Sequence, residues 1–203
     1  TDRAEEVLEE TDMAFLFAQK YHSAMKNVGP VRKEMGERTI FNILGPLTNP
    51  ANASRQLLGV YDKELVEKLA EVLANLGVTR GMSVCGGDGL DEITVTGPTY
   101  CCEIKDGELT SYEIIPEQFG LSTYPLAELV GGTPEENAQI TKDILSGTLK
   151  GAKRDVVLMN AGIGIYLGSE NLTMEEGIKK AEELINSGKA YEKMEEFVKA
   201  TQQ

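Results

Sequence analysis

Two acidic residues beside a glycine-rich run are the first place where this sequence could do chemistry. Asp91 and Glu92 follow the run Gly86-Gly87-Asp88-Gly89-Leu90. Glycine lets a backbone turn tightly or approach a ligand closely. Mg²⁺ takes one or two protein carboxylates and fills its other positions with water and phosphate oxygens. The pair could therefore hold Mg²⁺ beside a phosphorylated ligand, although adjacent acids at a helix N-terminus with no ligand would give the same pattern.

A basic segment, residues 20–38, is the second place. It contains five Lys and Arg residues against two Glu, a local charge of +3 in a chain whose net charge is −13. On a helix, its residues His22, Met25 and Arg32 would share one face. The guanidinium could fork onto a carboxylate, while the imidazole and the thioether could cover an aromatic ring. A solvated basic face would explain the same residues, so spacing alone leaves both interpretations open.

Composition limits the class of protein and its partners. The chain has 203 residues, of which 41% are hydrophobic and 26% charged, so it can bury a core and we expect a single α/β domain over residues 1–203. A net charge of −13 disfavours nucleic acid and anionic lipid as partners. We find no apolar run near the roughly 18–20 residues of a membrane helix and expect no membrane partner. The three cysteines (Cys85, Cys101 and Cys102) are too few for a disulfide framework, which favours a cytoplasmic location.

The order of predicted elements places the glycine-rich run at the end of a strand. Residues 56–60 and 82–85 read as strands, and between them apolar residues at helical spacing predict a helix that Asp62 opens and Gly77 ends. Strand, helix and strand over this length indicate a βαβ unit. Open α/β sheets usually bind ligands at the carboxyl ends of their strands, where Asp91 and Glu92 would then lie.

The rest of the chain predicts a hairpin followed by helices. Residues 98–115 read as a β-hairpin whose turn is Asp106-Gly107. Capping boxes at 133–136 and 173–176 predict two helices, and a last helix carries apolar residues up to 198. The apolar segment 156–167 favours a buried helix capped by Asp155. Residues 40–50 read as an apolar turn that runs into a stiff, proline-containing loop.

Several segments together resemble the central and later parts of the anthranilate phosphoribosyltransferase family. The resemblance extends over essentially the whole chain, and the run 38–50 is its most specific part. The matching segments are Phe15–Ala18, Tyr21–Lys26, Pro30–Glu34, Arg38–Pro50, Asp88–Glu92 and Asn160-Ala161.

The resemblance implies a fold, an activity and a set of roles. The fold would be the large α/β domain of the anthranilate phosphoribosyltransferase and nucleoside phosphorylase-like type, truncated at its N-terminus. The activity would transfer the phosphoribosyl group from phosphoribosyl pyrophosphate (PRPP) to the amino group of anthranilate, in tryptophan biosynthesis. Arg32 would bind the anthranilate carboxylate, His22 and Met25 would line the aromatic site, and Asp91 and Glu92 would hold Mg²⁺ on the diphosphate. No residue is identified as a general base.

The sequence also departs from the family. The glycine-rich PRPP loop (Gly-Thr-Gly-Gly-Asp) and the Lys-His-Gly-Asn stretch are absent. We therefore expect little or no transferase activity from this chain alone, and possible self-association through a sheet edge that the absent strands would leave exposed. Two alternatives stay open at this point: a related pyrimidine nucleoside phosphorylase-like enzyme, and a non-catalytic interaction module that retains the fold.

Overall fold

The computed structural model describes residues 2–16, 21, 34, 36 and 41–202. Its contacts divide the chain into two compact units, residues 53–190 and residues 1–52 together with 191–203. The expectation of a single domain over residues 1–203 stays a prediction. The part of the chain that the structure describes contains no helix long and apolar enough to cross a membrane.

The larger unit is built on a mixed four-stranded sheet, which confirms the predicted α/β class. The strand order is β1 (Arg55–Gly59), β2 (Arg80–Gly86), β3 (Thr99–Lys105) and β4 (Glu108–Ile114). The first two strands are parallel and the other neighbours antiparallel. The hairpin turn at Asp106-Gly107 has positive φ at both residues, as a tight two-residue turn requires.

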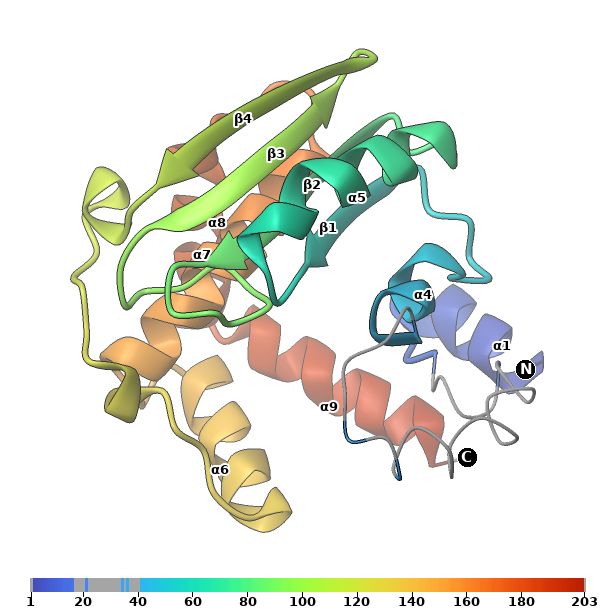
Figure 1. Cartoon of the computed structure of the whole chain (residues 1–203). Coiled ribbons are helices and arrows are strands. Elements are labelled where there is room, and N and C mark those ends of the chain that lie inside the picture. Colours follow the sequence, from blue (N-terminus) through green and yellow to red (C-terminus); the bar gives the residue numbers. More distant parts are fainter. Residues whose placement is uncertain (1, 17–20, 22–33, 35, 37–40, 203) are drawn as a thin grey trace. The chain divides into compact units, whose positions relative to one another are not determined.

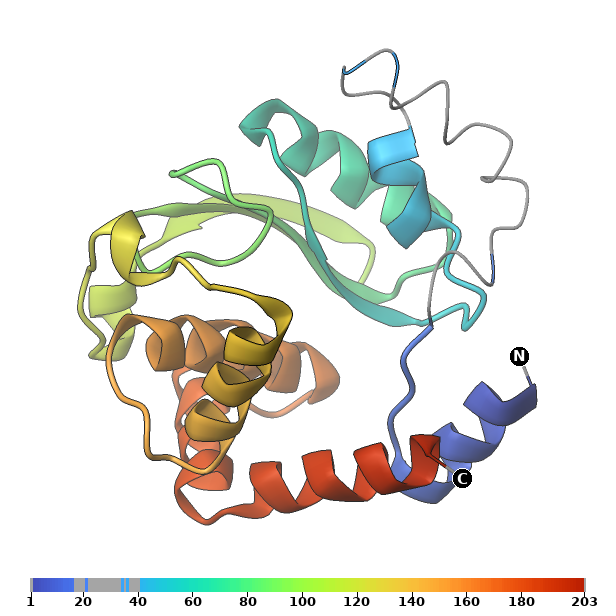
Figure 2. The ribbon, with the colours of Figure 1, turned by 90° about the horizontal axis from the view of Figure 1, so that it is seen from below.

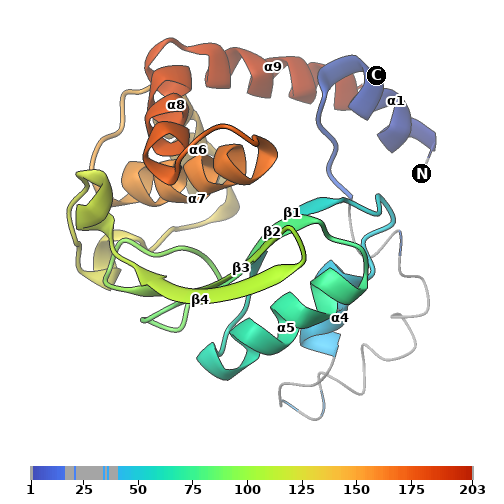
Figure 3. The same ribbon diagram turned by 90° about the horizontal axis from the view of Figure 1, so that it is seen from above.

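Helices cover both faces of this sheet (Figure 1, Figure 3). Helix α5 (Lys63–Asn75) covers one face and connects the two parallel strands. Its N-cap is Asp62, whose carboxylate accepts a hydrogen bond from Glu64 N, and Gly77 follows its end with a positive φ. Both residues therefore bound the helix as predicted.

Helices α7 (Ala152–Gly168) and α8 (Met174–Asn186) cover the opposite face. There they form a hydrophobic core with buried side chains of β2 and β3. The two helices pack closely because glycines meet at their contact. A Cβ on Gly177 would lie 2.3 Å from the carbonyl oxygen of Gly162. The capping box at Thr173 that opens α8 is confirmed, as is the one at Thr133 that opens α6 (Pro134–Leu145).

Two local predictions were wrong. Asp155 does not cap the apolar helix: Gly151 is the N-cap of α7, and Asp155 lies in its first turn with its carboxylate accepting from the Tyr124 hydroxyl at 2.7 Å. The apolar segment before the proline-containing loop is a helix, α4 (Phe41–Leu47), which includes Pro46. Pro46 supplies no amide donor to this helix, which ends one residue later at Leu47.

The remaining elements are short or belong to the smaller unit. Two 3₁₀ turns, η1 (Pro116–Phe119) and η2 (Leu126–Glu128), connect β4 to α6. In the smaller unit, α1 (Asp2–Thr11) packs beside α9 (Lys189–Thr201), where the Arg3 guanidinium donates to the carbonyl of Ala200 (Figure 2). The three cysteines are free and buried.

Candidate functional site

The loop that follows β2, residues 87–96, contains Asp88, Asp91 and Glu92 and is called the acidic segment below. It lies at the carboxyl ends of the two parallel strands, as the βαβ pattern predicted. It follows the last residue of β2 and contains turns and bends, with no helix starting at Asp91 or Glu92. The alternative of a helix N-terminus for this pair was therefore wrong. Both residues are exposed, whereas the next three, 93–95, are buried. The segment thus presents two carboxylates outward from a buried base.

Asp88 holds the segment in shape. Its Oδ2 accepts hydrogen bonds from the hydroxyls of Thr94 and Thr96, each at 2.6 Å, and its Oδ1 accepts from Leu90 N at 3.1 Å. Burial by itself raises the pKa of Asp88, but these hydrogen bonds to the ionised form outweigh it and lower the pKa. Asp88 is therefore an ionised structural residue that closes the segment on itself.

Asn160 of α7 ties the same segment to the helix layer. Its Oδ1 accepts from Ile93 N at 3.0 Å, and its Nδ2 donates to the carbonyl oxygen of Ile93 at 2.8 Å. The backbone groups of a buried loop residue are thereby satisfied by one side chain. A third contact comes from Tyr124, whose backbone amide donates to Val95 O at 2.9 Å.

Gly59 brings β1 against the acidic pair. A Cβ at Gly59 would lie 1.6 Å from the carbonyl oxygen of Asp91. No residue with a side chain could occupy this position without moving the peptide between Asp91 and Glu92. The close contact between the last residue of β1 and the loop after β2 thus fixes the backbone that carries the two carboxylates.

The electrostatics of this edge are strongly negative. Desolvation raises the pKa of Glu92, and the negative charges of Asp91 and Asp88 add to the rise. Burial also raises the pKa of the Cys85 thiol at the end of β2, with the charges of Asp62, Asp88 and Asp91 contributing. Within the described ranges, no lysine or arginine forms an ion pair with either member of the pair.

The donor set fits a cation that the protein shares with a ligand. The described residues contain no group of three or more His, Cys, Asp or Glu that could enclose a metal ion. Mg²⁺, however, commonly uses one or two carboxylates and completes its shell with water and substrate phosphates. Asp91 and Glu92 are exposed and form no ion pair within the described part of the chain, so they could supply those carboxylates.

The three residues predicted to bind an aromatic anion, His22, Met25 and Arg32, lie outside the described residues. Their proximity to Asp91 and Glu92 therefore stays a prediction.

Comparison with known proteins places the chain in a family. Residues 1–191 match the glycosyl transferase family, a/b domain. The chain belongs to this family. An anthranilate phosphoribosyltransferase of Endomicrobium trichonymphae is 52% identical over 199 residues, which are 98% of this chain and 59% of that protein.

Solved structures agree. The crystal structure of anthranilate phosphoribosyltransferase from Thermus thermophilus superposes with a TM-score of 0.91 at 42% identity, covering 99% of this chain and 59% of that one. The Saccharomyces cerevisiae enzyme in complex with PRPP and Mg superposes with a TM-score of 0.89 at 33% identity, covering 98% of this chain and 57% of that one. These matches confirm the resemblance and do not favour the nucleoside phosphorylase-like or non-catalytic alternatives. The chain spans a little under three fifths of the length of these relatives.

Sequence reasoning missed the residues that position the acidic pair. Asn160 stands as a polar residue inside the apolar segment 156–167, and that contrast was a usable signal. Gly59 had none, because its role depends on the loop that follows β2, and that loop meets Gly59 only through the parallel pairing of β1 and β2.

Proposed function

We propose that this chain forms part of a phosphoribosyltransferase that joins the anomeric carbon of PRPP to the amino nitrogen of anthranilate in tryptophan biosynthesis. The observation that carries the proposal is the outward presentation of Asp91 and Glu92 at the carboxyl end of β2, on a loop fixed by Asn160 and Gly59. The family match and the names of the relatives support it. A cytoplasmic location belongs to the same proposal.

In this proposal Asp91 and Glu92 hold Mg²⁺ against the diphosphate of PRPP. When bound, the metal ion would neutralise charge on the diphosphate leaving group. Desolvation raises the pKa of Glu92 and the negative charges of Asp91 and Asp88 add to the rise, so a cation bound beside these carboxylates would favour the ionised form. The complex of the yeast relative with PRPP and Mg supports the choice of metal.

The acceptor would be oriented by the basic segment. Arg32 would pair with the anthranilate carboxylate through two hydrogen bonds, and His22 and Met25 would cover its ring. The bond from the anomeric carbon to diphosphate breaks, the bond to the amino nitrogen forms, and that nitrogen releases a proton to water. Much of the rate would come from holding nitrogen and carbon in line, because positioning removes a large entropic cost.

The test is calorimetric titration of the chain with inorganic pyrophosphate and with PRPP, each with and without Mg²⁺. We expect binding that requires Mg²⁺ and that Asp91→Asn or Glu92→Gln weakens about tenfold or more, since a charge-assisted contact is lost. Glu183→Gln on α8 is the matched control, because it removes one exposed carboxylate away from the acidic segment.

Two results would contradict the proposal. One is pyrophosphate binding that is equally strong without Mg²⁺. The other is an equal loss of binding in Glu183→Gln and in Glu92→Gln, which would reduce the effect to the overall charge of the chain.

A further inference from the structure

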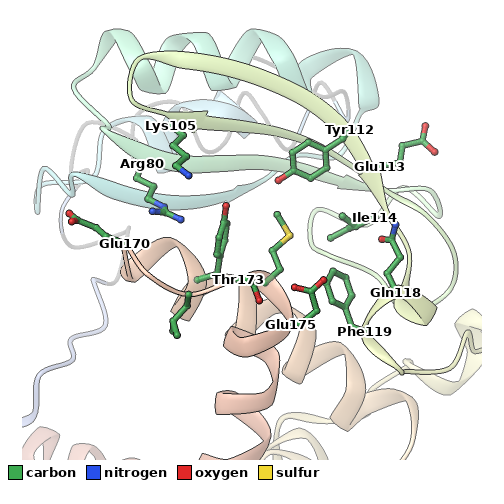
Figure 4. Close-up of a pocket in the computed structure, with 13 residues that line it drawn as sticks. Arg80, Lys105, Tyr112, Glu113, Ile114, Gln118, Phe119, Glu170, Thr173 and Glu175 are labelled. Carbon is green, nitrogen blue, oxygen red and sulfur yellow. The ribbon is translucent and has the colours of Figure 1, made fainter.

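A pocket lies in the larger unit, and none of the residues that line it belongs to the acidic segment. It has a volume of about 590 Å³ and opens between the sheet and the connection from α7 to α8 (Figure 4). It is lined by Arg80, the first residue of β2, whereas Asp91 and Glu92 follow the last residue of that strand. Seven strand residues span about 20 Å, so Arg80 and the acidic pair lie at opposite ends of β2. From Arg80 the pocket runs along the sheet to Ile114, which lies level with the last residue of β2 but two strands away from it.

Arg80 carries an unused hydrogen-bond donor. Arg80 is only 8% exposed, and its buried Nε has no hydrogen-bond partner in the part of the chain that the structure describes. The guanidinium carbon lies 4.6 Å from the centroid of the Tyr166 ring, which holds the side chain in place from one side. An unpaired buried donor on a charged group is costly. Because this Nε is itself buried, a ligand oxygen in the pocket would meet the part of the guanidinium that lines it.

A buried carboxylate that contacts two tyrosines of the pocket lining is already engaged. Glu103 is buried, and its two oxygens accept from the hydroxyls of Tyr112 at 2.7 Å and Tyr166 at 2.6 Å. Burial and the hydrogen bond from Tyr166 to Glu103 raise the pKa of Tyr166, and the positive charge of Arg80 opposes the rise. Glu103 therefore accepts from two tyrosines and forms no ion pair with Arg80.

A second cation faces the same end of the pocket. Arg55, Arg80 and Lys105 are direct neighbours across three strands, so they form a row on one face of the sheet. Arg55 is occupied, because it donates to Leu167 O at 2.9 Å and pairs with Glu170 at 3.1 Å. Lys105 has no ion pair in the described ranges. Figure 4 shows Arg80 and Lys105 projecting from the sheet side by side.

The other end of the pocket is apolar and acidic. Ile114 and Phe119 lie there with Gln118, and Met174 also contributes to the lining (Figure 4). Glu175, at the start of α8, adds a negative charge near Phe119. A ligand with negative charge at both ends would meet repulsion from this side, whereas a ligand with a single carboxylate at the cationic end and an apolar body would not.

We propose that this pocket binds a small monocarboxylate with an aromatic or apolar body. The carboxylate accepts hydrogen bonds from the Arg80 guanidinium and from Lys105. The body extends over Met174 toward Phe119 and Ile114. The site is separate from the transferase site proposed above and does not depend on it.

The test uses the chain labelled with ¹³C at its methionine methyl groups. Met174 lines the pocket, whereas Met82 and Met159 are fully buried in the core and serve as internal references. Phenylacetate is the probe, phenylacetamide its neutral match, and inorganic phosphate the polyanion. We expect phenylacetate at millimolar concentration to shift the Met174 signal saturably, and the other two compounds to leave it unmoved.

Variants locate the carboxylate. Lys105→Gln and Arg80→Gln should each weaken phenylacetate binding about tenfold, because each removes a charge-assisted contact. Lys179→Gln, which removes an exposed charge from α8, is the matched control and should bind as the unmodified chain does. If Arg80→Gln fails to fold, Lys105→Gln decides the question, since Lys105 is exposed.

Three outcomes would overturn the proposal. The first is a Met174 signal that phenylacetate leaves unmoved. The second is an equal response to phenylacetamide or phosphate. The third is a response confined to other methionines, which would place the ligand elsewhere in the chain, for example beside Met25.

Discussion

Asn160 spans the backbone of Ile93 with both ends of its side-chain amide. Its oxygen accepts from the Ile93 amide at 3.0 Å and its nitrogen donates to the Ile93 carbonyl at 2.8 Å, while the same nitrogen also donates to Val156 O at 2.9 Å within α7. One helical residue thus sets the position of the loop that presents Asp91 and Glu92. The position of the acidic pair is therefore set by the helix layer as well as by the sheet.

Asn160→Ala should destabilise the chain and disorder the acidic segment. The substitution leaves the amide and the carbonyl of Ile93 without partners in a buried place, which costs about 1–3 kcal/mol in the free energy of unfolding. Urea denaturation measures this loss. Magnesium-dependent pyrophosphate binding should weaken in the same variant, although Asn160 would touch no ligand.

Asn171→Ala is the control for that change, because Asn171 is exposed and its side chain makes no hydrogen bond in the described part of the chain. It should leave stability within about 0.5 kcal/mol of the unmodified chain. Equal stability of the two variants would show that Asn160 does not hold the loop.

Gly59→Ala should displace the acidic pair. The added Cβ would sit 1.6 Å from the carbonyl oxygen of Asp91, so the loop must move, at a cost of about 1–3 kcal/mol in the free energy of unfolding. Gly164→Ala, in the exposed part of α7 with nothing within 4 Å of the new Cβ, should instead stabilise the chain by about 0.5–1 kcal/mol. Urea denaturation of the two variants measures both changes in the free energy of unfolding. A Gly59→Ala chain as stable as the unmodified one would mean that this close approach is absent in solution.

Much of the fold could be predicted because its signals are local. Asp62 and Gly77 bound α5, and Thr133 and Thr173 open helices with side chains that cap their own backbone. Asp106-Gly107 supplies its own turn geometry. The start of α7 was misplaced for the opposite reason. Asp155 is of a residue type that often caps helices, but its carboxylate instead accepts a hydrogen bond from Tyr124, which is distant in the sequence.

The site divides along the same line. The acidic pair and its place at a strand end followed from composition and from the βαβ pattern. The support of the pair did not, because Gly59 and Asn160 meet the loop only through tertiary packing. The pocket at Arg80 was missed for a related reason. Its cationic row is formed by residues on three different strands, and only their register brings them together.

Acid should remove the contribution of Asp88 to stability. Burial opposes ionisation of Asp88, but hydrogen bonds from Thr94, Thr96 and Leu90 lower its pKa in the folded chain. A carboxyl group with a lowered folded pKa stabilises the fold above its unfolded pKa of about 3.9 and loses that effect as the pH falls through the folded value. The difference in free energy of unfolding between the unmodified chain and Asp88→Asn should therefore be constant from neutral pH to about pH 5 and shrink below about pH 4. A difference that does not change with pH would contradict ionised hydrogen bonding at Asp88.

The chain by itself should show little or no turnover of PRPP and anthranilate. It spans 59% of the length of its Endomicrobium relative, and it contains no Gly-Thr-Gly-Gly-Asp segment. Removing even one preorganised donor to a transition state costs about 10²–10³ in rate. A fluorescence assay of anthranilate consumption measures turnover, with a full-length relative as the positive control. Activity near that of the relative would contradict the prediction and would mean that the chain holds a complete site.

The chain should also associate with itself through β1. Among the described strands β1 is at one edge of the sheet, and it is half of the only parallel pair there, whereas parallel strands normally lie in the interior of a sheet. An edge strand can pair with a second chain. Light scattering should therefore give a mass that rises with concentration. Hydrogen exchange at high and low concentration should show added protection at residues 55–59. The opposite edge, β4, is the internal control, because its exposed and charged side chains discourage pairing and its exchange should not change. A compact monomer at every concentration, or protection confined to β4, would contradict this assignment.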